Sequence, residues 1–206
     1  MIKNVIFDLG RVVYRYWPRE DIINLGYSEA QADQIMDCVF DSPTWQEIDR
    51  DQYTMQEGKE KFCADFPHLE ADIRRIMDDG WADRVETIMP ESLDFFHDVK
   101  RQGYKTYILS NFAADGFDYI RTRDAHFFDQ VDGMVVSGHV KLIKPDPEIY
   151  KLLLNRYNLV PQETLFIDDN QDNITAAKAL GIHGILFTDI ADCKQQFKQL
   201  TTSRTA

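Results

Sequence analysis

Short apolar runs alternate with helical patterns along the second half of the chain, from about residue 91 onward. Leu93, Phe96 and Val99 share one face of a helix, and Gly103 stands where that helix should end. Strand-like runs follow at 107–109, 134–136, 165–167 and 184–187, and the opening segment 2–7 has the same character. Short apolar strands that are separated by helices indicate βαβ units and a parallel sheet.

Two further helices are marked by their ends. Asp146 followed by Pro147 is a favourable N-cap and first-turn pair, and it opens a helix whose apolar positions include Ile149 and Leu153. A second helix is expected over about 173–180, with Gly181 placed to close it. Both helices lie between strand-like runs, as the crossover connections of a parallel sheet require.

The segment 17–88 has a different pattern, with helical spacing and no convincing strand. Two capping boxes, Ser28 with Gln31 and Thr54 with Glu57, begin helices here. Helical spacing is followed by Ala32, Ile35, Met36 and Val39, and again by Ile73, Ile76 and Met77. We therefore expect an α/β core formed by 1–16 and 89–206, with a helical insert at 17–88. The chain would cross between them at Trp17-Pro18 and Met89-Pro90.

Composition narrows the class of protein and its partners. The chain has 206 residues and is 44% hydrophobic, which suits a single domain with a modest insert. Its formal charge of −12 argues against nucleic acid or an anionic membrane as a partner, and any phosphate site needs local cations. The chain has three cysteines without a CxxC motif, and the apolar run Val5-Ile6-Phe7 follows almost directly after Met1. Both features predict a reduced, cytoplasmic protein. No stretch approaches the roughly 18 apolar residues that a membrane span needs.

Polar residues follow the strand-like runs where a parallel sheet binds its ligands. Ligands of open parallel sheets bind at the carboxyl ends of the strands. The residues in those positions are Asp8 after the first run, Ser110 and Asn111 after the second, and Asp168 and Asp169 after the run at 165–167. Lys144 lies in the loop before the helix that begins at Pro147. Each residue alone has an ordinary structural explanation as a cap, a turn former or a solvated side chain, but together they predict one polar cluster.

The chemistry of this set points to a metal and a phosphate. Neighbouring carboxylates repel each other by about 4 kcal/mol at an effective dielectric near 20, and a divalent cation removes that conflict. Hard oxygen ligands favour Mg²⁺, which commonly also binds a substrate phosphate. Lys144 and the Ser110 hydroxyl can hold phosphoryl oxygens. Asp8, on the first and expected central strand, is then the best candidate for a nucleophile.

Four motifs in this order resemble those of the haloacid dehalogenase superfamily. They are Phe7-Asp8-Leu9-Gly10, Leu109-Ser110-Asn111, Lys144-Pro145-Asp146-Pro147 and Phe166-Ile167-Asp168-Asp169-Asn170. The insert looks like the helical cap of the superfamily's first subclass, placed after the first strand of a Rossmann-like core. The Asp-Leu-Gly and Asp-Asp-Asn segments look most like a sugar-phosphatase branch. That branch includes α-D-glucose-1-phosphate phosphatase and is similar to the phosphatase half of epoxide hydrolases.

The resemblance implies a phosphatase that acts in two steps on a small phosphorylated metabolite. Asp8 would attack the phosphate monoester, and water would open the resulting aspartyl-phosphate. Mg²⁺ would be bound by the Asp8 carboxylate, the backbone carbonyl of Gly10, Asp168 and Asp169. The phosphoryl group would be bound by Ser110, Asn111 and Lys144, with Lys144 also steadying Asp8. We expect a monomer or a weak homodimer.

One position departs from the superfamily's usual pattern. Most phosphatases of the superfamily have a second aspartate two residues after the nucleophile, where it protonates the leaving group, and here that residue is Gly10. A general acid is worth about 10²–10⁴ in rate, so easily departing groups such as anomeric or acyl phosphates should be preferred. Glu47, Asp49 and Asp51 in the cap could replace the missing acid; the alternative is that they are ordinary surface acids.

Two other functions stay open. A dehalogenase would need no metal, although relatives of that kind usually carry Tyr where Gly10 stands. A non-catalytic phosphate-binding or regulatory protein is favoured by the missing acid and disfavoured by the presence of Asp8, Lys144 and the acid pair. Other classes lack their motifs: the five histidines have no metal-ligand spacing, and no GxSxG, GxGxxG or Walker loop is present.

Overall fold

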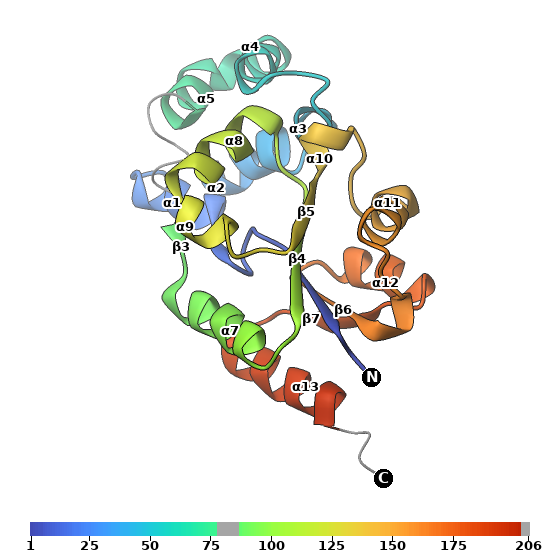
Figure 1. The fold of residues 1–206 in the computed structure, drawn as a ribbon. Coiled ribbons are helices and arrows are strands. Elements are labelled where there is room, and N and C mark those ends of the chain that lie inside the picture. The colour runs from blue at the N-terminus through green and yellow to red at the C-terminus, as the bar shows by residue number, and fades with distance from the viewer. Residues whose placement is uncertain (78–86, 203–206) are drawn as a thin grey trace.

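A five-stranded parallel sheet forms the centre of the protein in the computed structural model, which describes residues 1–77 and 87–202 (Figure 1). In spatial order its strands are β5 (Gly133–Val136), β4 (Lys105–Ser110), β1 (Asn4–Phe7), β6 (Thr164–Asp168) and β7 (His183–Leu186). Phe7 at the end of β1 is level with Ile108 on one neighbour and Ile167 on the other. The strand that leads to Asp8 is therefore central, as the sequence predicted.

Helices cover both faces of the sheet, which gives the α/β Rossmann-like fold that the alternating pattern predicted (Figure 1). One face packs against α7 (Pro90–Arg101), α8 (Ala114–Arg123), α9 (Ala125–Phe128) and α13 (Ile190–Thr202). The other packs against α11 (Pro147–Tyr157) and α12 (Gln171–Ala179). Successive side chains of β1 serve the two layers, because Phe7 joins the first cluster and Ile6 the second. Short turns α10 (Ser137–Val140) and η3 (Pro161–Glu163) complete the core.

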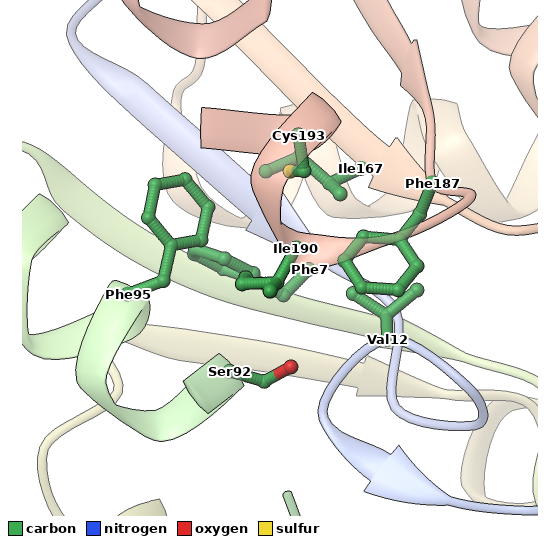
Figure 2. A pocket seen from close by; sticks show the side chains of 8 residues that line it. All are labelled: Phe7, Val12, Ser92, Phe95, Ile167, Phe187, Ile190 and Cys193. Atoms are coloured by element: carbon green, nitrogen blue, oxygen red, sulfur yellow. The ribbon is translucent and has the colours of Figure 1, made fainter. Parts of the chain in front are cut away.

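A narrow apolar crevice lies between the sheet and the helices α7 and α13 (Figure 2). Its lining consists of Phe7, Val12, Ser92, Phe95, Ile167, Phe187, Ile190 and Cys193. The crevice has no room for a water-sized molecule, and burial raises the pKa of the Cys193 thiol to about 12, so the thiol stays protonated. These properties describe hydrocarbon packing between two layers rather than a ligand site.

The helical cap follows the first strand and has a hydrophobic core of its own. Its helices are α1 (Pro18–Asn24), α2 (Glu29–Ile35), α3 (Pro43–Asp49), α4 (Met55–Asp65) and α5 (Glu70–Met77), with a π-helical turn η1 (Met36–Phe40) and a short η2 (Pro67–Leu69). Both predicted capping boxes are present at the starts of α2 and α4. Ile22, Ile48 and Phe62 are fully buried in the cap core, which Ala113 of the α/β core also joins. The cap is thus a separately packed unit seated on the core.

The two chain crossings between core and cap lie side by side as a small antiparallel ribbon. Strand β2 (Tyr14–Arg15) pairs with β3 (Thr87–Ile88), and helices α1 and α7 begin at Pro18 and Pro90. The expectation of no strand within 17–88 is wrong at β3, because a two-residue strand is too short to show an alternating pattern. The division of the chain at 17 and 88 itself stays a prediction, and residues 78–86 lie outside the described part.

The helices of the structure can also be compared with what a membrane span requires. Over the described ranges, none of the helices combines the length and apolar character that a bilayer span requires.

Candidate active site

Three carboxylates meet at the carboxyl edge of the sheet. Asp8 directly follows β1, Asp168 is the last residue of β6, and Asp169 comes next. One carboxylate oxygen from each of the three lies within 4.8 Å of the others. The parallel pairing of β1 with β6 brings them together, because Phe7 and Ile167, the residues just before them, are directly paired. The structure therefore gathers the acidic residues that the sequence placed at this edge.

Lys144 is the buried cation of the cluster. Its ammonium nitrogen Nζ lies 2.8 Å from Asp8 Oδ1 and 2.7 Å from Asp168 Oδ2, and its side chain is 2% exposed. Burial alone would lower the pKa of Lys144, but the charges of Asp168 and Asp8 outweigh it and raise that pKa above its usual value. Lys144 therefore stays charged and ties the ends of two neighbouring strands together.

Asp168 is held by donors on all sides. The Asn173 side-chain amide donates to its two oxygens at 3.0 and 3.1 Å, and the Asn170 backbone N–H donates to Oδ1 at 2.8 Å. With Lys144 on Oδ2 and no solvent exposure, this carboxylate is rigidly placed. Sequence analysis did not single out Asn173, because an asparagine in the first turn of a helix looks like an ordinary polar residue.

Asp8 is anchored through one oxygen only. Oδ1 accepts the Leu9 backbone N–H at 2.7 Å and faces Lys144, so among the described residues Oδ2 is the oxygen available to an incoming group. Burial raises the pKa of Asp8 to about 7, with Lys144 lowering it and Asp168 and Asp169 raising it further. The metal-free cluster thus holds more negative charge than Lys144 neutralises, which favours binding of a cation.

Asp169 is the most accessible member of the cluster. Its side chain is 23% exposed, and Arg11 Nη1 lies 3.5 Å from Oδ2. Burial and the charge of Asp168 raise its pKa, against the opposing charges of Arg11 and Lys144. Three converging carboxylates without nitrogen or sulfur ligands fit a hard cation such as Mg²⁺.

A compact turn places Gly10 beside Asp8. The backbone N–H groups of Val13 and Tyr14 both donate to the Leu9 carbonyl at 2.8 Å, and Arg11 has the positive φ of 60° that the turn needs. A Cβ at Gly10 would approach only the Tyr16 side chain, at 3.8 and 3.9 Å, so the position has room for a side chain. The use of the Gly10 carbonyl as a metal ligand stays a prediction.

Ser110 and Asn111 lie at the end of β4, next to β1 in the sheet. The Ser110 side chain is buried, and in the part of the chain that the structure describes its hydroxyl has no hydrogen-bond partner. The Asn111 side chain binds the Lys144 backbone twice: its Oδ1 accepts the Lys144 backbone N–H at 2.8 Å, and its Nδ2 donates to the Lys144 carbonyl at 3.0 Å. The hydroxyl is thus free to meet a ligand, whereas the amide braces the loop that carries Lys144.

The cap reaches the site through the end of α3. Helix α3 packs on α10, and Asp51 Oδ2 lies 3.6 Å from Lys141 Nζ, three residues before Lys144. Asp49, the last residue of α3, is partly buried and interacts electrostatically with both Lys144 and Asp8. Burial, together with the charge of Asp8, raises the pKa of Asp49 to about 7, against the opposing charges of Lys144 and Arg50. Asp49 is one of the three cap acids named from the sequence, and its charge interacts with the cluster.

Comparisons with known proteins find similar sequences and a similar fold. The family model described as haloacid dehalogenase-like hydrolase matches residues 2–181. The D-ribitol-5-phosphate phosphatase of Bacteroides thetaiotaomicron is 26% identical over 98% of this chain and 100% of its own. A sesquiterpene phosphatase of Aspergillus oryzae is 24% identical over 96% of each chain. A solved enzyme from B. thetaiotaomicron, in complex with magnesium and inorganic phosphate, has the same fold, with a TM-score of 0.64 and 21% identity over 90% of this chain and 93% of its own.

Proposed function

Because the chain belongs to the haloacid dehalogenase-like hydrolases, we propose that it is a Mg²⁺-dependent phosphatase of small phosphate monoesters. Full-length relatives that are named as phosphatases support this class of reaction. The observation that carries the proposal is the state of Asp8. One of its oxygens is fixed by Lys144 and the Leu9 backbone, and its other oxygen faces a cluster that needs a cation.

In the proposed reaction Asp8 acts as the nucleophile. Its Oδ2 forms a bond to phosphorus while the bond from phosphorus to the ester oxygen breaks, which leaves an aspartyl-phosphate and releases the alcohol. Water then attacks phosphorus, the acyl phosphate opens, and inorganic phosphate leaves. Lys144 keeps Oδ1 in place throughout, because it also pairs with the immobile Asp168.

Asp8, Asp169 and the Gly10 carbonyl would hold Mg²⁺, with Asp168 acting directly or through water. When bound, the ion supplies positive charge against the phosphoryl oxygens. Asp168 already accepts hydrogen bonds on both oxygens, so its main contribution is to position Lys144. Asp169 is more exposed and has fewer partners, which suits a ligand that must exchange water for metal.

The phosphoryl group would rest against Ser110 and Lys144. The buried Ser110 hydroxyl can donate to one phosphoryl oxygen, and the Lys144 ammonium can neutralise a second. Asn111 remains a proposed phosphate ligand. The two hydrogen bonds between its side chain and the Lys144 backbone also hold the Lys144 loop in place.

A sugar phosphate is the proposed substrate class. The relative named as a D-ribitol-5-phosphate phosphatase acts on a phosphorylated sugar alcohol, which supports a small polyhydroxylated substrate. Without a side chain at Gly10, the core itself cannot protonate the leaving group. We therefore expect an anomeric phosphate to react faster than a plain alkyl one, so glucose 1-phosphate should be turned over faster than glucose 6-phosphate. Faster turnover of the 6-phosphate would overturn this preference.

The function is tested by screening phosphorylated metabolites for phosphate release, with Mg²⁺ and with a chelator, beside the variant Asp8→Asn. We expect turnover that needs both Mg²⁺ and Asp8. Turnover that survives Asp8→Asn would remove Asp8 as the nucleophile. Bound phosphate without any turnover would favour a regulatory protein, and halide release from 2-haloacids without metal would favour a dehalogenase.

A further inference from the structure

In the part of the core that the structure describes, position 10 offers no side chain that could protonate the leaving group. Position 10, where an acid could follow the nucleophile, is a glycine, and Lys144 and Arg11 are cations that are poor proton donors. Lys144 is also committed to Asp8 and Asp168. An alcohol that leaves as an unprotonated alkoxide is strongly disfavoured, so a donor from outside the core would be worth about 10²–10⁴ in rate.

The cap presents carboxyl groups on a helix that is held against the active-site loops. Helix α3 contacts α10, and the ion pair between Asp51 and Lys141 joins its C-terminal end to the segment that leads to Lys144. The Ser42 side chain caps the other end of α3, and Ile48 is fully buried in the cap core. The C-terminal end of α3 is thus held by the ion pair of Asp51 with Lys141 and by the burial of Ile48.

At the end of that helix, Asp49 is the acid whose charge interacts with the active-site cluster. Its carboxylate interacts with Lys144 and Asp8, and in the described part of the chain it makes no hydrogen bond or ion pair that would commit it elsewhere. Asp51 is committed to Lys141. Glu47 precedes Asp49 by two residues, and residues so spaced face different sides of a helix.

We propose that the cap residue Asp49 is the general acid and base of the reaction, in place of the side chain that Gly10 lacks. This inference rests on the proposed phosphatase function. Asp49 donates its proton to the ester oxygen as the bond to phosphorus breaks and Asp8 Oδ2 bonds to phosphorus, so the alcohol leaves neutral. The Asp49 carboxylate then takes a proton from the attacking water, which returns Asp8 as a carboxylate and releases phosphate.

Two observations suit Asp49 to this role. Burial brings its pKa to about 7, where a carboxyl group is present in both protonation states at neutral pH, as an acid that later serves as a base requires. Its place on the cap also means that the acid is complete only when the cap is seated on the core. Substrates that the cap cannot close over would then lose acid catalysis as well as binding energy.

The decisive experiment compares leaving groups rather than overall activity. Wild type, Asp49→Asn and the control Glu47→Gln are assayed on 2,4-dinitrophenyl, 4-nitrophenyl and phenyl phosphate, whose leaving groups need protonation to an increasing degree, and on one alkyl phosphate. In kcat/KM, which reports formation of the aspartyl-phosphate and not its hydrolysis, Asp49→Asn should slow the alkyl and phenyl esters by about 10²-fold or more and the dinitrophenyl ester by less than about 5-fold. Glu47→Gln should follow wild type throughout.

A rescue variant separates chemistry from structure. Gly10→Asp is sterically allowed, because a Cβ there meets only Tyr16 at 3.8 Å or more. In the Asp49→Asn background it should restore at least about 10-fold of the lost rate on the alkyl ester. Mg²⁺ affinity by calorimetry should match wild type in Asp49→Asn and in Glu47→Gln, the two variants that leave position 10 unchanged. An equal loss on all four esters, or no loss on any, would overturn the assignment of Asp49. Failure of the wild type to turn over even the dinitrophenyl ester would instead refute the phosphatase function.

Discussion

The two ends of the same sheet treat acidic side chains in opposite ways. At the amino end, Asp132 lies 2.8 Å from Lys105 and 3.2 Å from Lys100, and it accepts the Thr106 backbone N–H. Although burial opposes it, these partners lower the pKa of Asp132 to about 2. At the carboxyl end, three carboxylates face the one buried ammonium of Lys144, and burial raises the pKa of Asp8 to about 7.

The difference separates a structural carboxylate from a functional one. The folded state favours the ionised form of Asp132, so this carboxylate stabilises the fold at neutral pH. Asp8 must be ionised to act as a nucleophile. Because its pKa is raised, its ionisation at neutral pH lowers the free energy of unfolding until a cation binds. Replacing the carboxylate should therefore lower activity but not stability at Asp8, and lower stability but not activity at Asp132.

The largest effect is expected from Asp8→Asn. Turnover should fall by at least about 10⁴-fold, because no other carboxylate oxygen occupies the place of Oδ2. The metal-free protein should be at least as stable as wild type at pH 7, because one member of a repelling cluster has become neutral. Phosphate release and urea denaturation measure the two effects. A clear loss of stability would show that Asp8 is structural.

Removal of the buried cation should damage both properties. Lys144→Met leaves Asp8 and Asp168 without a counter-charge, and breaking a buried ion pair in this way costs about 3–5 kcal/mol. Turnover should also fall by about 10²–10³-fold through loss of charge stabilisation. Lys141→Met is the matched control, since that side chain is 62% exposed and its removal should cost less than about 1 kcal/mol. Equal stabilities of the two variants would contradict the central role of Lys144.

Without metal, pH should act on the cluster in a defined window. An unfolded aspartate ionises near its model value of 3.8, whereas folded Asp8 keeps its proton up to about 7. A raised pKa stabilises the fold below about pH 4, and this contribution is lost as pH rises towards 7, by about 2–4 kcal/mol. Urea unfolding of wild type and Asp8→Asn in chelator, from pH 4 to 8, should show a smaller decline in the variant, in which only the raised pKa values of Asp49 and Asp169 remain. Saturating Mg²⁺ should remove it; a decline of the same size in both proteins would contradict the assignment to Asp8.

The smallest effect is expected at the amino end. Asp132→Asn should lower the free energy of unfolding by only about 1–2 kcal/mol at pH 7, because Lys105 and Lys100 are partly solvated. Turnover should stay unchanged, because Asp132 lies at the opposite end of the sheet from the carboxylate cluster. The lowered pKa means that this stabilisation exists above about pH 4 and is lost as pH falls towards 2. Denaturation at pH 7 and at pH 3 measures the change, and a cost that grows at acid pH would contradict it.

Strand ends could be predicted from the sequence because they depend on local pattern. The apolar runs located all five strands of the sheet, and parallel pairing then forced Asp8 and Asp168 to the same edge. The two capping boxes and the Asp146 cap were also visible, because a cap is decided within four residues.

Contacts between distant segments could not be predicted in this way. Asn173 grips Asp168 and Asn111 braces Lys144 through side-chain amides that carry no periodicity. Strand β3 exists only because β2 lies beside it. The direction in which α3 presents Asp49 depends on how the cap sits on the core, which no local pattern encodes.

The central claim, that Asp8 carries the phosphoryl group, can be tested by trapping the acyl phosphate. The protein is mixed with Mg²⁺ and a substrate that it turns over, quenched within one turnover and reduced with borohydride, and the peptide containing Asp8 is analysed by mass spectrometry. We expect conversion of Asp8 to homoserine only when both Mg²⁺ and substrate are present. An unmodified Asp8 under conditions in which phosphate is being released, or modification at Asp168 or Asp169 instead, would contradict the account.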